Sequence, residues 1–196
     1  MRFICGKFRR RVYWKVAVEK TAAVLDYMDS VAVAADYSFV DLGLPSGTLW
    51  ATENTDGTLQ LHDYRDARGR YLGLLPSREQ FQELIDLCKW DWDRERKEFV
   101  ITGPSGASIS LPAAGSFYNR HRRAYGKEGY YWTSTMSEGR KGHAWYLFMF
   151  SFPHMRWENL ENKGMLMTDE YFFYLNEFSV RFVYPKLKEK NGKSDI

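Results

Sequence analysis

Residues 39–52 have the sequence FVDLGLPSGTLWAT, in which two short, largely apolar runs flank a turn. Pro45, Ser46 and Gly47 supply the turn chemistry, because proline presets φ, serine bonds its own backbone and glycine accepts a positive φ. The stretch therefore predicts a strand, a turn and a second strand.

The clearest helix of the chain is predicted at residues 76–88. Ser77 is a suitable N-cap, and Gln80 stands three residues later, as a capping box requires. One apolar stripe runs along the helix, formed by Phe81, Leu84, Ile85 and Cys88. The helix should pack on the core by this stripe, with Cys88 as a buried thiol.

Short strands dominate the rest of the chain. Residues 99–102 and 108–111 predict a hairpin around a turn at 103–106. Trp90 and Trp92 share one face if their segment is a strand. Further strands are expected at 129–135, 144–150 and 178–184, and loops at 53–75 and 117–128, the second of them basic.

The chain is predicted to have three parts. Residues 12–35 favour a helix, because apolar residues recur at three- and four-residue steps. The expected organisation is a basic N-terminal helical attachment segment at 1–38, an α+β domain at 39–185 and a basic flexible tail at 186–196.

Charge and hydropathy limit the partners and the location of the protein. The formal net charge is only +3, so no nucleic acid is expected as a partner. Basic residues interrupt every apolar run near the N-terminus, so no signal peptide is predicted. No stretch approaches the roughly 20 apolar residues of a transmembrane segment. We expect a soluble protein that is cytoplasmic or part of a phage or surface-displayed particle.

The sequence contains no recognisable catalytic or metal-binding motif. Its histidines are scattered at His62, His121, His143 and His154. The alternating acids of residues 91–95 lack the glycine and the distal glutamate of a calcium-binding loop. The glycine-rich phosphate loops and the nucleophile elbow are absent. We therefore expect no enzyme activity, no cofactor and no metal.

Six segments, taken in order, resemble one family. They are VDLGLPSGTLWAT at 40–52, LPSREQFQEL at 75–84, VITGPSG at 100–106, LPAAG at 111–115, GYYWTST at 129–135 and FSVR at 178–181. Together they are similar to the Fibrobacter succinogenes major paralogous domain family, which belongs with the C-type-lectin-like folds. The resemblance covers about residues 39–185.

The resemblance implies an α+β C-type-lectin-like domain with paired terminal strands, one or two helices and an irregular surface before the last strand. Members are typical of gut Bacteroidales and their phages, and some relatives in this fold are variable proteins of diversity-generating retroelements. Phe182 and Glu177 replace the family's usual proline and glycine. The calcium-dependent sugar-binding signatures of animal lectins are absent, so the resemblance does not imply that mode of binding.

Residues 145–178 have the composition of a binding surface. Tyrosine and tryptophan offer large rigid contact areas, and asparagine offers adaptable hydrogen bonds. On a rigid scaffold, such a stretch is a candidate binding site. The predicted ligand-binding residues are Tyr146, Phe148, Phe150, Trp157, Asn159, Asp169, Tyr171, Phe173 and Asn176.

The alternative is that these aromatic residues belong to the core. Within 144–150, one alternating set of side chains must face the core. If Leu147 and Met149 point inward, the aromatic residues that alternate with them point outward; the opposite register buries them. For Trp157 and for the aromatic residues of 171–174, the sequence leaves core and contact equally open.

The leading hypothesis is a ligand-binding or display protein that presents 145–178 to a protein or glycan. Residues 1–38 would then oligomerise it or attach it to a larger assembly. The alternative is a structural or assembly component, such as a phage-tail or pilus-like protein, that uses the same aromatic residues in a permanent interface.

Overall fold

The computed structural model describes residues 32–139, 141–151, 164–168 and 175–185. The chain divides into two compact units, Met1–Asp36 and Tyr37–Ile196. Of the first unit, only 32–36 are described, and 32–34 are helical. The rest of the expected helix and the expected tail lie outside the described residues.

The second unit consists mostly of short strands. In chain order its elements are β1 (Phe39–Asp41), β2 (Thr48–Asn54), β3 (His62–Asp63), α2 (Tyr64–Tyr71), α3 (Arg78–Leu87), β4 (Lys89–Asp93), β5 (Glu98–Thr102), β6 (Ser108–Pro112), β7 (Ser116–Tyr118), β8 (His121–Arg123), β9 (Glu128–Met136), β10 (Ala144–Phe150), β11 (Met165–Thr168), β12 (Asn176–Phe178) and β13 (Arg181–Pro185). The predicted α+β class is confirmed.

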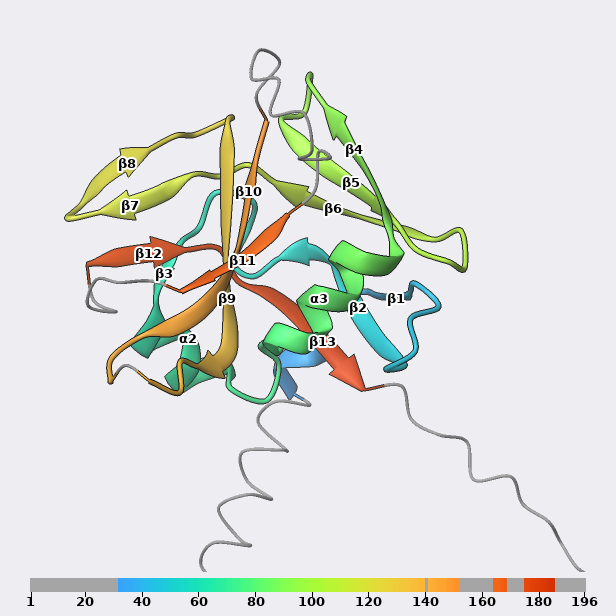
Figure 1. The fold of residues 1–196 in the computed structure, drawn as a ribbon, viewed down its shortest axis with the longest axis horizontal. Coiled ribbons are helices and arrows are strands. Elements are labelled where there is room, and N and C mark those ends of the chain that lie inside the picture. The colour runs from blue at the N-terminus through green and yellow to red at the C-terminus, as the bar shows by residue number, and fades with distance from the viewer. Residues whose placement is uncertain (1–31, 140, 152–163, 169–174, 186–196) are drawn as a thin grey trace, which may run out of the picture. The chain divides into compact units, whose positions relative to one another are not determined.

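The described strands form antiparallel sheets with the orders β1-β2-β13, β4-β5-β6, β9-β10-β11 and β3-β12-β7-β8 (Figure 1). β1 and β13 both pair with β2, so the first and last strands of the domain lie in one sheet without pairing with each other. Helix α3 packs against β9, β10 and β11.

The opening stretch forms the predicted strand, turn and strand. Gly47 has a φ of 67° and its N–H donates to the Leu44 carbonyl at 2.9 Å. The β5–β6 turn docks on the same stretch, where the Ser105 N–H donates to the Leu42 carbonyl at 3.0 Å. A Cβ on Gly103 would lie 2.3 Å from that carbonyl oxygen, so the contact requires glycine.

Helix α3 begins with the capping box that the sequence predicts. The Gln80 N–H donates to Ser77 Oγ at 3.2 Å, and the Ser77 N–H donates to Gln80 Oε1 at 2.7 Å. Gln80 also donates from its amide nitrogen to Thr48 Oγ1 at 2.9 Å, which joins the start of α3 to β2.

Replacing Ser77 with alanine is expected to lower the free energy of unfolding by about 1 kcal/mol, because one N–H of the first turn loses its acceptor. Urea denaturation measures the change. Gln82→Ala is the control, since Gln82 is exposed on the same helix and its amide nitrogen donates to Asp86 one turn later. Equal losses in the two variants would contradict a specific role for the cap.

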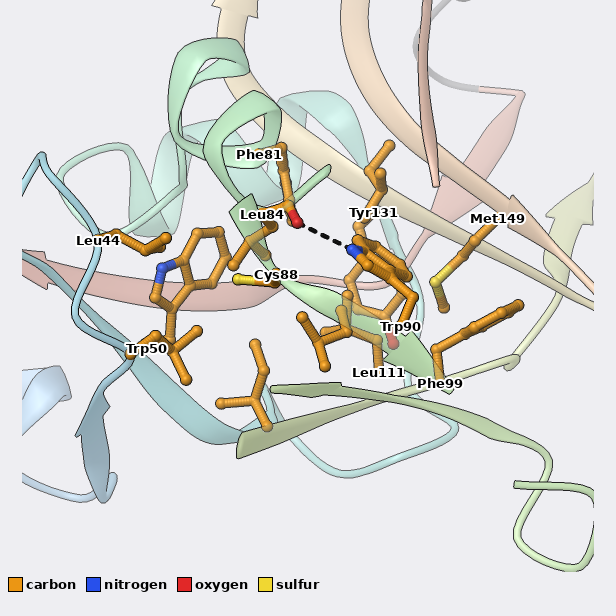
Figure 2. Packing of buried hydrophobic residues seen from close by; sticks show 14 of the residues in the cluster. Leu44, Trp50, Phe81, Leu84, Cys88, Trp90, Phe99, Leu111, Tyr131 and Met149 are labelled. Atoms are coloured by element: carbon orange, nitrogen blue, oxygen red, sulfur yellow. Dashed lines mark hydrogen bonds between the residues drawn. The ribbon is translucent and has the colours of Figure 1, made fainter. Parts of the chain in front are cut away.

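The main hydrophobic core lies between α3, β2, the β4–β5–β6 sheet and one face of β9–β10 (Figure 2). Trp50, Phe81, Phe99 and Tyr131 are fully buried in it. Trp90 reaches into the same core, and its indole N–H donates to the Leu84 carbonyl at 2.8 Å. Cys88 is buried here, as predicted.

Two segments predicted as loops contain regular structure. Residues 53–75 include β3 and α2, and 117–128 include parts of the β7–β8 hairpin and of β9. These two segments are largely polar, so the pattern of apolar residues does not predict their strands and helix. In α2 only Tyr64, Ala67 and Tyr71 are buried.

Candidate functional site

The side-chain register of β10 decides which of its aromatic residues can reach a ligand. Leu147 and Met149 are fully buried in the main core. Tyr146, Phe148 and Phe150 therefore lie on the opposite face of the strand, in the outward register considered above. Phe148 and Phe150 are half-buried there, whereas Tyr146 is buried, with 9% of its surface exposed.

A second aromatic cluster covers Tyr146. Its ring lies 5.0 Å from that of Phe178 and 6.3 Å from that of Trp132, between ring centroids. Trp132 and Phe178 are themselves 4.2 Å apart, and Tyr64 packs edge-on against Trp132 at 4.9 Å. Tyr146 thus supports the outer face of the sheet and offers little contact area, which corrects its predicted role in contact.

A ladder of half-buried aromatic rings continues from this cluster across β9 and β10. Tyr130 stacks on Phe178 at 4.9 Å, and Phe148 lies 5.0 Å from Tyr130. Phe150 stacks on Phe148 at 5.6 Å. Because the opposite face of β10 is packed in the main core, these rings are held by a rigid sheet.

Methionines of β11 lie beside the ladder. Met165 pairs with Phe148 and Met167 with Tyr146 across the two strands, so each shares a face with its partner. Met167 is 39% exposed, and its sulfur is 3.9 Å from the Tyr146 hydroxyl. The flexible, apolar side chains of Met165 and Met167 therefore border the aromatic ladder.

The hydroxyl of Tyr130 is fixed by a carboxylate. It donates a hydrogen bond to Glu128 on the same strand. Burial, the Glu128 bond and its negative charge together raise the pKa of Tyr130 far above its usual range. The Tyr130 hydroxyl therefore stays neutral at physiological pH, and its single O–H is committed to the Glu128 carboxylate.

An arginine and an asparagine extend the surface onto the neighbouring sheet. Asn176 and Tyr118 pair across β12 and β7, and both are half-buried. The Arg123 guanidinium lies over the Tyr118 ring at 4.4 Å and acts electrostatically on Tyr130. We call the set Tyr118, Arg123, Tyr130, Phe148, Phe150 and Asn176 the aromatic–arginine surface.

The structure brings together only part of the predicted site. Phe148, Phe150 and Asn176 lie on the aromatic–arginine surface. The predicted residues Trp157, Asn159, Asp169, Tyr171 and Phe173 lie outside the described residues. Sequence reasoning missed Tyr118, Arg123 and Tyr130, although the alternation in β9, where Tyr131 faces the core, is a signal that places Tyr130 outside.

The described residues contain no group of three or more His, Cys, Asp or Glu side chains that could hold a metal ion. His62 is buried between two carboxylates, with Nδ1 3.2 Å from Asp66 and Nε2 3.6 Å from Asp56. These acids lie at opposite ring nitrogens, so the three groups do not converge. Burial raises the pKa of the Cys88 thiol to about 11, which leaves it unreactive at neutral pH.

Comparison with protein-family models, curated proteins and solved structures found no match. In the part of the chain that the structure describes, no helix is long and apolar enough to cross a membrane.

Proposed function

We propose that the protein is a non-catalytic ligand-binding or display protein whose aromatic–arginine surface contacts a protein or glycan. The single observation that carries this proposal is the half-buried ladder of Tyr130, Phe148 and Phe150 on β9 and β10, whose opposite face packs in the main core. Rigid aromatic side chains bind at a low cost in conformational entropy.

The composition of the surface favours reversible binding over a permanent interface. Arg123 and Asn176 stand among the aromatic rings, and Glu128 fixes Tyr130. Permanent interfaces are larger and more apolar, whereas tyrosine, arginine and asparagine are typical of interfaces that form and dissociate. A structural or assembly role, such as a phage-tail or pilus-like component, is the second candidate, supported by the apolar margin that Met165 and Met167 provide.

The proposal includes a C-type-lectin-like fold. Terminal strands in one sheet, the helices α2 and α3, and several small antiparallel sheets support it. In its sharper form the protein is a variable protein of a diversity-generating retroelement. Copies from one genome would then differ mainly within 145–178.

The binding proposal is tested by probing glycan arrays and arrays of purified cell-surface proteins with the full chain and with Phe148→Ala and Phe150→Ala. We expect at least one ligand whose affinity falls by about 30-fold in each variant, which is the loss typical of an interface hot spot. Leu87→Ala is the matched control, because Leu87 is 48% exposed on α3, away from the surface.

Thermal unfolding must show that each variant is folded at the assay temperature. Ligands that bind wild type, Phe148→Ala and Phe150→Ala equally would refute binding at this surface. A change in oligomeric state on size-exclusion chromatography, with no change in ligand binding, would favour the assembly role.

A further inference from the structure

The β7–β8 hairpin presents an unusual turn beside the aromatic–arginine surface. Tyr118 pairs with His121, so Asn119 and Arg120 form a two-residue loop. Their φ values of 47° and 65° are both positive, which is the type I′ geometry that favours glycine at the second position. Arginine occupies that position here, so the turn carries a charge where glycine would be more stable.

All three residues of β8 are exposed, but their cations differ in how they are held. Arg122 is tied to the fold, since its two Nη atoms donate to the Ala114 and Leu59 carbonyls at 2.7 and 2.9 Å. The contact of Arg123 is the face of the Tyr118 ring. Among the residues that the structure describes, no hydrogen bond or ion pair engages the guanidinium groups of Arg120 and Arg123, so their donors can serve a ligand.

Cations already cover aromatic rings around the hairpin. Arg123 covers Tyr118 at 4.4 Å, Arg122 covers Phe117 at 4.7 Å, and Lys97 lies over Tyr125 at 5.2 Å. Nucleic-acid bases and sugar rings bind such side chains by stacking on their faces. Here the groups offered outward are the guanidinium groups of Arg120 and Arg123, which pair with carboxylates or phosphates. Because cations already cover the neighbouring rings, a carboxylate ligand fits this place better than a nucleic acid that must stack its bases.

The described carboxylates near the hairpin offset only part of this charge. Glu128 accepts the hydrogen bond of Tyr130. Glu177 on β12 is half-buried; burial and the neighbouring Asp63 raise its pKa, while His62, Arg120 and Arg122 lower it. Four exposed cations, Arg120, Arg122, Arg123 and Lys127, therefore stand in the hairpin and the following loop, against the three acids Glu128, Glu177 and Asp63 among the described residues.

We propose that the ligand is an acidic segment of a protein, whose aspartate or glutamate side chains bind Arg120 and Arg123 while its apolar side chains contact Tyr130 and Phe148. This inference rests on the proposed function and names the chemistry of its ligand. Complementary charge of this kind gives specificity and fast association.

The test measures fluorescence anisotropy of labelled poly-glutamate with the full chain, beside poly-glutamine, poly(dT) and hyaluronate. We expect poly-glutamate to bind most tightly and its affinity to fall as salt is raised from about 0.05 M to about 0.5 M. Arg123→Gln and Arg120→Gly should each weaken it about tenfold. Arg120→Gly should also keep or raise the thermal midpoint, because glycine suits the positive φ.

Arg94→Gln is the matched control, since it makes the same charge change at an exposed residue between β4 and β5. Binding that is unchanged by Arg120→Gly and Arg123→Gln would overturn the proposal. Tighter binding of poly(dT) or hyaluronate, lost in the same variants, would also overturn it and assign another ligand class. A neutral array ligand sensitive to Phe148→Ala would leave the proposed function standing without this inference.

Discussion

Replacing Arg181 with methionine is expected to lower the free energy of unfolding by about 3 kcal/mol. Arg181 is fully buried on β13. Its Nη1 donates to the Ala51 carbonyl on β2 at 2.8 Å, and its Nη2 donates to the Ser110 carbonyl on β6. One side chain thus joins strands of two sheets.

Two effects oppose each other in this substitution. Burial lowers the pKa of Arg181, so the folded protein bears a cost for holding the charge away from water, and methionine removes that cost. Methionine also leaves two buried carbonyl groups without donors, at about 1–3 kcal/mol each. Methionine fills much of the same volume, so the substitution leaves little cavity. Because methionine cannot donate, we expect the loss of the two hydrogen bonds to outweigh the removed cost of burying the charge.

Urea denaturation followed by tryptophan fluorescence measures the effect. Arg181→Lys should lose less, since a lysine ammonium can still donate to a carbonyl. Arg94→Met, at an exposed position, should unfold like the wild type. A wild-type midpoint for Arg181→Met would mean that the carbonyls find other partners, and that Arg181 does not join the sheets energetically.

The parts of the fold that the sequence predicts well are those fixed by local chemistry. The Ser77 cap, the glycine turn at 103–106 and the shared face of Trp90 and Trp92 depend on neighbours a few residues away. The two faces of β10 follow from simple alternation, once Leu147 and Met149 are placed in the core.

The polar elements were missed because their stability depends on distant partners. Helix α2 is short and mostly polar, and Gly69 lies within it, so its sequence does not predict a helix. Its buried Tyr64 packs on Trp132 of β9, a distant partner that stabilises it. The N-cap Asp63, which accepts from the Asp66 N–H at 2.8 Å, is a local signal that could have revealed it.

The candidate site shows the same division. Alternation places Phe148 and Phe150 outside, but it cannot say that Tyr146 will be covered. The burial of Tyr146 depends on its contact with Phe178 of β12, which lies more than thirty residues later in the chain. Arg123 joins the surface only because β7 pairs with β12, a pairing that no local pattern encodes.

Replacing Trp132 with alanine is expected to cost about 3–5 kcal/mol of unfolding free energy. Trp132 is fully buried, and its indole N–H donates to the His62 carbonyl at 2.8 Å. The substitution opens a cavity among Tyr64, Tyr146 and Phe178 and leaves that carbonyl unpaired. Trp132→Phe keeps part of the ring volume, so it should lose about half as much.

Trp145→Phe is the control, because Trp145 is half-buried beneath the exposed Arg78 at 4.1 Å and should lose less. Phe178 stacks on Tyr130 and packs at a tilt against Trp132, so Trp132→Phe should also weaken ligand binding at temperatures where the domain remains folded. Stability equal to that of Trp145→Phe would argue against the second aromatic cluster as a support. Full stability loss with unchanged ligand affinity would show instead that β9 and β10 position Tyr130 and Phe148 by themselves.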